Sequence, residues 1–231
     1  MSILHKIRSN NLGFSIGRAV LSNNLIVGSK PYQKAYEKKI NKVIKNWEGK
    51  PPLILDIGTT NACNSNCIMC PHHLLKNIGY MNMDLFRKII DNCESFGIKN
   101  VVLSFFGEPL LDQSIMDKIK YAKSKNLNVS FFSNASLLNQ EAGKKLIESG
   151  LDSMTISLDA YSKETYEKIR LGLNFDTTCN NIMNLVSLRK EMNSAKPRVS
   201  LVLVEMEENK KEIKKFYARW KKIVDSVNII N

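Results

Sequence analysis

Three cysteines in one short segment are the side chains of this sequence best suited to chemistry. Cys63, Cys67 and Cys70 are spaced four and then three residues apart, so three thiolates on one loop can surround a metal ion or cluster. Soft thiolates select zinc or iron-sulfur centres. A closed zinc site would take His72 or His73 as a fourth ligand, but structural zinc sites usually draw on two separated pairs of ligands. The spacing favours an iron-sulfur cluster and leaves zinc open.

The elements that must position this loop follow a regular alternation. Runs rich in β-branched and aromatic residues, typical of strands, alternate with longer segments of helical spacing. The predicted strands are Leu53–Ile57, Asn100–Phe105, Asn128–Phe132, Ser153–Leu158, Arg198–Val204 and Ser226–Ile230. The predicted helices are Asp84–Phe96, Gln113–Lys125, Gln140–Glu148, Lys163–Ile169, Thr177–Met192 and Asn209–Ile223.

Such alternation predicts an α/β fold of parallel strands joined by right-handed crossovers. Six units are too few for a full eight-stranded barrel, so periodicity leaves two alternatives, a partial barrel and an open doubly wound sheet. A mainly helical segment from Ile3 to Trp47 precedes the first strand and is interrupted near Pro51. We therefore expect a helical, basic N-terminal extension over 1–50 and a core domain over 51–231.

Length and composition are those of a globular protein. The 231 residues are 43% hydrophobic and 24% charged, enough for one buried core with a small appendage, and they argue against wholesale disorder. The odd count of five cysteines, three of them clustered, is a poor disulfide framework. Cys93 and Cys179 are predicted to be buried apolar residues. With neither a spanning apolar run nor a secretion signal recognised, the expected location is the cytoplasm.

The positive charge lies mostly at the ends of the chain. The net charge is +12, and residues 1–50 hold ten Lys/Arg against two Asp/Glu. Lysines 34, 38, 39, 42 and 45 recur on a helical period and predict a solvated helix face. No nucleic-acid partner is expected, because the basic residues are not interleaved with aromatic residues on a working surface. Peripheral contact of the extension with an anionic surface stays open.

Polar residues follow the other predicted strands where they end, and parallel α/β folds place reactive groups there. Gly107, Glu108 and Pro109 follow the second strand, Asn134 follows the third, and Ser157 closes the fourth. Glycine lets backbone approach a ligand closely, and a glutamate can meet an ammonium group.

Taken together, these segments resemble the radical S-adenosylmethionine (radical SAM) enzymes. The loop Cys63-x-x-x-Cys67-x-x-Cys70 resembles the family's cluster-binding signature, and Gly107-Glu108-Pro109 its glycine-glutamate-proline motif. The other matching segments are Ser133-Asn134-Ala135, Ser157-Leu158-Asp159, and the helix with Tyr166 and Arg170. The resemblance covers about residues 52–231 and implies a partial (β/α)6 TIM-like barrel.

The resemblance also implies cofactors and a site. One [4Fe-4S] cluster is expected on the three cysteines, with its open iron chelated by S-adenosylmethionine (SAM), and Glu108 is expected to hold the amino group of SAM. Met69 and Val204 are expected near adenine, with Val202 beside them. Ser157 is expected at the ribose or carboxylate and Arg170 at the carboxylate. Asp159 either joins this site or closes its loop, and Asn134 either contacts the ligand or only forms the turn.

Two departures from the family pattern bear on these expectations. Ala135 stands where the family has glycine, so we expect a changed turn there. Several segments look most like members with a cysteine-rich C-terminal SPASM or twitch domain, yet no cysteine follows Cys179. The chain is then either a core domain lacking that part, the favoured alternative, or a member that works with one cluster. No general base is assigned.

The implied activity is reductive cleavage of SAM to a 5′-deoxyadenosyl radical that abstracts hydrogen from a substrate. The expected substrate is a peptide or protein side chain, or a small polar molecule such as a sugar or aminocyclitol. The expected electron donor is a flavodoxin or ferredoxin. Two alternatives stay open, a glycyl-radical activating enzyme and a non-enzymatic zinc-binding scaffold that meets a partner through its basic ends.

Overall fold

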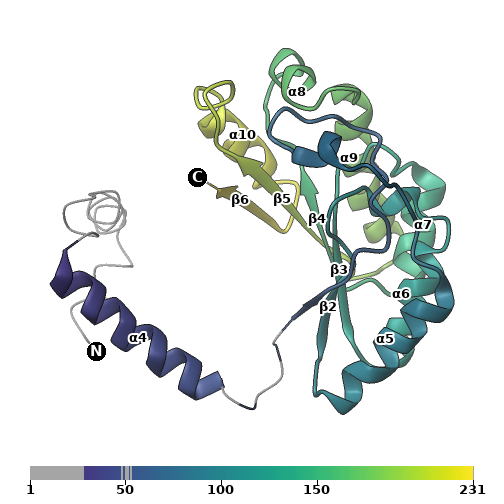
Figure 1. The fold of residues 1–231 in the computed structure, drawn as a ribbon. Helices are drawn as coiled ribbons and strands as arrows, with labels where there is room; N and C mark the ends of the chain where they lie inside the picture. The colour runs from purple at the N-terminus through teal and green to yellow at the C-terminus, as the bar shows by residue number, and fades with distance from the viewer. Residues whose placement is uncertain (1–28, 48, 50–51, 53, 231) are drawn as a thin grey trace. The chain divides into compact units, whose positions relative to one another are not determined.

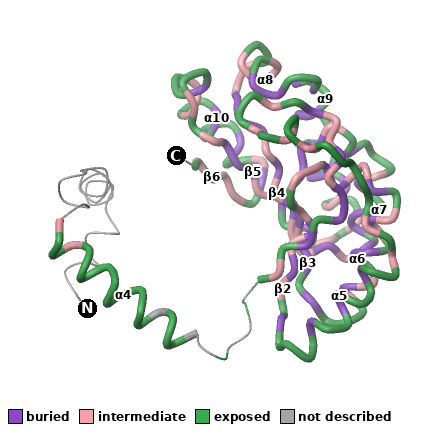
Figure 2. The backbone as a smooth tube through the Cα atoms, viewed as in Figure 1, coloured by how far each residue is buried: buried purple, intermediate pink, exposed green. Residues whose placement is uncertain are grey.

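The computed structural model describes residues 29–47, 49, 52 and 54–230 of the chain. The chain divides into two units, Met1–Pro51 and Pro52–Asn231. The first unit contains helix α4 (Lys30–Trp47), and the helix expected before it lies outside the described residues. The five periodic lysines of α4 are exposed, and most of the helix is exposed along its length (Figure 2). No helix among the described residues is long and apolar enough to cross a membrane.

The second unit is a six-stranded parallel sheet covered by helices on one side (Figure 1). The strands are β1 (Leu55–Asp56), β2 (Asn100–Val102), β3 (Asn128–Ser133), β4 (Ser153–Ser157), β5 (Arg198–Val204) and β6 (Ser226–Ile230). The α-helices are α5 (Met83–Ser95), α6 (Ile115–Ser124), α7 (Gln140–Glu148), α8 (Lys163–Ile169), α9 (Phe175–Glu191) and α10 (Ile213–Trp220). Two 3-10 helices complete it, η1 (Pro71–Leu74) and η2 (Pro109–Leu111).

Strand order decides between the two architectures that periodicity left open. Each strand pairs in parallel with the next, in the order β1-β2-β3-β4-β5-β6. A doubly wound sheet reverses direction at a switch point, and this sheet has none. The predicted partial (β/α)6 barrel is therefore confirmed, with one curved sheet and its helices on the outer side (Figure 1).

The core lies between the outer face of the sheet and the helices, and its residues come from alternate strand positions and the inward stripe of each helix. Phe131 of β3 and Met154 of β4 are fully buried, as are Phe86 of α5 and Leu146 of α7. Figure 2 shows this burial running along the sheet and the helix faces packed on it. The prediction that Cys93 and Cys179 are buried is confirmed.

Asparagines begin three of the outer helices. Asn82, Asn139 and Asn174 each have extended backbone and accept a hydrogen bond from the amide three residues on, at 2.9 Å. These caps satisfy backbone N–H groups that a helix leaves without an internal partner. They fix where each helix begins and so how the preceding loop runs.

The second strand and the last helix are among the predicted elements that are shorter in the structure. Strand β2 ends at Val102 because the hydroxyl of Ser104 takes over the pairing, accepting from the amide of Phe132 at 2.7 Å. The last helix begins at Ile213, not Asn209, because the Asn209 side chain bonds backbone groups of the loop before it. Polar side chains thus replace regular backbone pairing at both places.

Candidate active site

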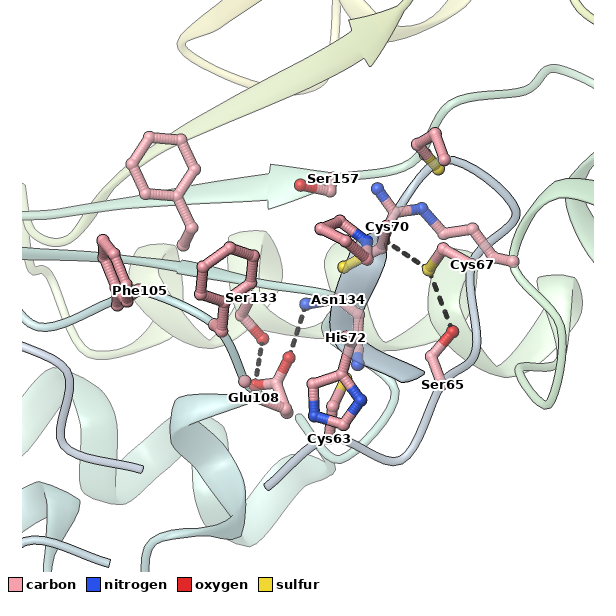
Figure 3. Close-up of a pocket in the computed structure, with 16 residues that line it drawn as sticks. Cys63, Ser65, Cys67, Cys70, His72, Phe105, Glu108, Ser133, Asn134 and Ser157 are labelled. Atoms are coloured by element: carbon pink, nitrogen blue, oxygen red, sulfur yellow. Dashed lines mark hydrogen bonds between the residues drawn. The ribbon is translucent and has the colours of Figure 1, made fainter. Parts of the chain in front are cut away.

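A cavity of about 340 Å³ lies at the carboxyl ends of the strands (Figure 3). It brings together nine of the twelve residues singled out from the sequence. These are Cys63, Cys67, Met69, Cys70, Gly107, Glu108, Asn134, Ser157 and Arg170. Pro109, Asp159 and Val204 do not line it: Pro109 begins η2, and Asp159 accepts hydrogen bonds from Arg170 and from the amide of Val204.

The cysteine loop is tied to the segment after α8. The amide of Asn66 donates to the carbonyl of Leu171 at 2.9 Å, and that of Ile68 donates to the carbonyl of Ile169 at 3.0 Å. Cys67 lies in the chain between the two donating residues, and Arg170 lies between the two accepting residues. The two hydrogen bonds therefore place Cys67 next to Arg170. The loop position therefore depends on contacts made about a hundred residues later in the chain.

All three thiols are half-buried and line the cavity. Burial raises the pKa of the Cys63 thiol, and the neighbouring carboxylate of Glu108 adds to the effect. Both histidines are engaged with backbone: His72 Nε2 lies 2.7 Å from the carbonyl of Asn61, and His73 Nδ1 3.3 Å from that of Cys70. Among the described residues, no three Cys, His, Asp or Glu side chains are gathered around the position of a single metal ion.

This donor set fits a [4Fe-4S] cluster. Three soft thiols on one loop face the same space, and a cube with three cysteine ligands keeps one iron free for a further ligand. The same cavity continues from the thiols towards Glu108 and Ser157 (Figure 3). A ligand on the open iron would therefore meet both oxygen-bearing side chains.

Gly107 lets the chain after β2 pass against the cysteine loop. Its φ is 136°, and a Cβ there would lie 2.6 Å from the carbonyl oxygen of Thr60 and 2.9 Å from that of Ala62. The next amide, that of Glu108, donates to the carbonyl of Ala62 at 2.7 Å. Only glycine combines this backbone conformation with so close an approach. Pro109 then starts η2 and turns the chain away.

Glu108 is a buried carboxylate that accepts three hydrogen bonds. Its exposed fraction is 1%, and it accepts from Ser133 Oγ and the amide of Asn134 at 2.7 Å and from the amide of Leu110 at 3.1 Å. Burial raises the pKa of Glu108, while these donors and Arg170 act against the rise. Among the described residues Glu108 makes no ion pair within salt-bridge distance, so a cation in the cavity would find an available buried anion.

Asn134 braces the site through its side chain. Its Nδ2 donates to Asn64 Oδ1 at 2.9 Å, and its Oδ1 accepts from the amide and the hydroxyl of Ser136. The next residue, Ala135, has a φ of 57°, in the left-handed region that costs a residue with a Cβ about 1 kcal/mol or more. Asn181 supports this backbone by donating to the carbonyl of Ala135 at 2.8 Å.

Asp159 and Arg170 form a buried ion pair beside the cysteine loop. Arg170 Nε donates to Asp159 Oδ2 at 2.8 Å, and Nη2 bonds the same oxygen. The other carboxylate oxygen accepts from the amide of Val204 at 2.7 Å. Asp159 is fully buried, and its role in the structure is to hold Arg170 and the end of β5. Val202 is buried, and Val204 is half-buried.

The cavity also contains residues that motif reasoning did not single out. Phe105 and Phe132 line it with exposed fractions of 75% and 48%. Ser133, which belongs to the matching segment after the third strand but was given no role, bonds Glu108 within it. Ser65 lies within the loop, with Oγ 3.0 Å from Cys67 Sγ (Figure 3). Their positions in the sequence could have pointed to these residues, because Phe105 and Phe132 end predicted strands and Ser65 lies between two cysteines of the loop.

Comparison with known proteins places this site in a family. A cofactor-modifying protein for the tungsten-containing aldehyde ferredoxin oxidoreductase of Pyrococcus furiosus is 32% identical over 160 residues, covering 67% of this chain and 44% of that protein. A GTP 3′,8-cyclase of Clostridium perfringens is 30% identical over 182 residues, covering 74% of this chain and 52% of that enzyme. The chain thus spans about half the length of these relatives.

Solved structures agree on the fold. The structure of Streptococcus suis SuiB bound to S-adenosylmethionine superposes with a TM-score of 0.68 at 15% identity, covering 87% of this chain and 46% of SuiB. SuiB bound to its precursor peptide SuiA gives a TM-score of 0.65 at 16% identity, covering 87% and 44%. The model of the Radical SAM superfamily, whose enzymes use a [4Fe-4S] cluster and SAM, matches residues 57–219. With well over half of its length matched, the chain belongs to the radical SAM superfamily.

Proposed function

We propose that residues 51–231 are a radical SAM core domain that binds one [4Fe-4S] cluster on Cys63, Cys67 and Cys70 and cleaves SAM reductively. The observation that supports this most is the shared cavity. Three thiols and the buried carboxylate of Glu108, which has no ion-pair partner among the described residues, face the same space. A ligand that chelates iron through an amino acid group and also carries an ammonium matches both features.

When bound, the cluster and SAM supply a 5′-deoxyadenosyl radical that abstracts hydrogen from the substrate. The residues of the chain bind and orient the cofactors. Glu108 holds the α-amino group of SAM, and Gly107 lets the chain that carries Glu108 pass close to the cysteine loop. Ser157 and Arg170 line the side of the cavity where the carboxylate or ribose would lie. Met69, which directly precedes Cys70 in the chain, also lines the cavity and is proposed to pack against adenine.

The proposed substrate is a peptide or protein side chain, or a small polar molecule. Support for a peptide is the fold shared with SuiB, which was solved with a bound precursor peptide. Support for a small molecule is the relation to GTP 3′,8-cyclases. Resemblance to SPASM and twitch members fits either class. A flavodoxin or ferredoxin is the proposed electron donor, and the basic extension over 1–50 is the proposed contact with an anionic surface.

The proposal is tested by anaerobic reconstitution of the chain with iron and sulfide, followed by dithionite and SAM. Wild type is expected to release 5′-deoxyadenosine, measured by mass spectrometry. Cys67→Ala is expected to release none, because the cluster loses one of three ligands. Cys93→Ala is the matched control, since Cys93 is buried on α5 outside the cavity, and it should behave as wild type.

A second variant examines the SAM site separately. Glu108→Gln keeps the shape of the side chain and removes its charge, so it should retain iron but bind SAM about 10- to 100-fold more weakly, the equivalent of a charged hydrogen bond. Equilibrium dialysis with labelled SAM measures this. A colourless preparation that retains zinc and makes no 5′-deoxyadenosine would instead support the scaffold alternative.

A further inference from the structure

The sulfur of Cys67 has surroundings that the other two cysteines of the triad lack. Ser65 Oγ lies 3.0 Å from Cys67 Sγ, and Arg170 Nη1 donates to the same sulfur at 3.6 Å. Among the described residues no side-chain donor is within hydrogen-bond distance of the sulfur of Cys63 or Cys70. Of the three sulfurs, that of Cys67 therefore has a polar and positively charged environment.

Both donors are held in place by other parts of the fold. The Arg170 side chain is 10% exposed, and the remaining bonds of its guanidinium go to the buried carboxylate of Asp159. Asp159 itself is held by the amide of Val204 and, at its carbonyl, by Asn209 Nδ2 at 2.8 Å. A guanidinium anchored at two nitrogens presents its third at a defined place.

The hydroxyl of Ser65 has a second hydrogen-bond partner, so it can either donate to the Cys67 sulfur or accept from it. Ser65 Oγ also donates to the carbonyl of Leu171 at 3.1 Å, so a neutral Cys67 thiol can donate to Ser65 while Ser65 donates to Leu171. A cysteine that binds iron has lost its proton. Its sulfur can then only accept, and the hydroxyl of Ser65 rotates to donate to it.

We infer that Ser65 and the Asp159-held Arg170 set the reduction potential of the cluster through the sulfur of Cys67. This inference rests on the proposed binding of a [4Fe-4S] cluster. A reduced cluster carries one more negative charge than the oxidised one, and hydrogen bonds to its sulfurs stabilise that charge. A guanidinium beside one ligand acts in the same direction. Both residues are positioning residues that raise the midpoint potential.

The test is a redox titration of the reconstituted full chain, followed by the absorbance and the electron paramagnetic resonance signal of the cluster. It is run without SAM, so that contacts of Arg170 with SAM play no part. Ser65→Ala removes one donor and leaves the charge. Arg170→Gln removes both the guanidinium donor and its positive charge. Arg170→Lys keeps the charge, but its single ammonium cannot contact Asp159 and the Cys67 sulfur at the same time in the way that the guanidinium does.

All three variants should have a midpoint potential more negative than wild type, with the largest shift in Arg170→Gln. The matched control is Arg189→Gln. Arg189 is also ion-paired, to Asp225 at 2.5 Å, but this pair lies at the amino ends of β5 and β6, whereas the cavity lies at the carboxyl ends of the strands. The midpoint potential of Arg189→Gln should equal that of wild type. Iron and sulfide content and circular dichroism show that the clusters compared are equivalent.

A fully loaded Ser65→Ala and Arg170→Lys at the wild-type potential would overturn the inference. If Arg170→Gln fails to take up iron, these two variants decide the question. The outcomes also separate this inference from the proposed function. A wild-type chain that forms no [4Fe-4S] cluster refutes both, whereas a normal cluster with unchanged potentials in the variants refutes the role of Ser65 and Arg170 alone.

Discussion

The side-chain amide of Asn134 donates a hydrogen bond of 2.9 Å to Oδ1 of Asn64, which ties the turn after β3 to the cysteine loop. Asn64 in turn donates to Ser136 Oγ at 2.8 Å. The two asparagines and the serine thus close a small network next to Cys63. The loop that carries the proposed cluster is braced from a strand that follows it by about seventy residues.

Replacing Asn134 should loosen the cysteine loop. Asn134→Ala removes this brace and the acceptor for Ser136, so we expect a loss of about 1 kcal/mol in stability and faster loss of iron to a chelator. Urea unfolding and the rate of iron release measure the two effects. Asn174→Ala is the matched control, because it removes the cap of α9 at a similar cost but should release iron like wild type. Equal release rates in both variants would contradict the brace.

A methyl group at Gly107 should be poorly tolerated. Gly107→Ala would bring a Cβ to within 2.6 Å of the Thr60 carbonyl oxygen at a φ of 136°, so we expect a loss of about 2 kcal/mol or more, measured by urea unfolding. At Gly79 a Cβ meets nothing within 4 Å. Gly79→Ala should therefore leave stability within about 0.5 kcal/mol of wild type. Similar losses for both would show that the close approach at Gly107 is not the cause.

A buried lysine holds the turn behind Glu108. Lys118 Nζ lies 2.5 Å from Asp112 Oδ2 and donates to the carbonyl of Met81 at 2.6 Å, and the lysine side chain is fully buried. Lys118→Met leaves the Asp112 carboxylate buried without its cation, so we expect a loss of about 3–5 kcal/mol in thermal or urea unfolding.

The double variant Lys118→Met with Asp112→Asn provides the control for that ion pair. It removes both charges, so it should be more stable than Lys118→Met alone. If the second substitution brings no recovery, the cost comes from lost packing of the lysine stem and not from the uncompensated charge.

Stability should depend on pH through Asp152. Burial would raise the pKa of Asp152, but Lys123, Lys196 and the amide of Val129 outweigh it and hold the pKa below its usual value. The carboxylate therefore stabilises the fold above an unfolded-state pKa of about 4, and this contribution is lost as the pH falls through the lower folded-state pKa.

The measurement compares the urea midpoints of the cluster-free wild type and Asp152→Asn between pH 7 and pH 3. Wild type should be more stable by about 1 kcal/mol at neutral pH, and the difference should shrink below about pH 4. A difference that stays constant down to pH 3 would show that the charge of Asp152 is not its source.

Several features of this protein follow from local sequence alone. Alternating β-branched and helical segments place the ends of all six strands within three residues of the observed ends, because periodicity reflects which face of each element is buried. The cysteine spacing and the motif at Gly107 and Glu108 identify the family, since three thiols on one loop need no distant residue to define them.

Other features depend on residues that meet only in the folded chain. Ser104 ends β2 by bonding Phe132, and Asn209 delays α10 by bonding Asp159 and Val204, contacts that periodicity does not encode. The choice between partial barrel and doubly wound sheet is likewise made by strand order, because both architectures use the same local alternation.

The surroundings of the thiols show the division most clearly. From sequence, Arg170 is a residue at the end of a helix and Cys67 a metal ligand 103 residues earlier. Only the sheet, which brings the ends of β1 and β4 to the same edge, places the guanidinium against the sulfur with Asp159 behind it. Residue types and spacing therefore determine which chemistry is available, whereas the tertiary structure decides which sulfur receives a positive charge, because electrostatic interactions depend on distance in space and not on separation along the chain.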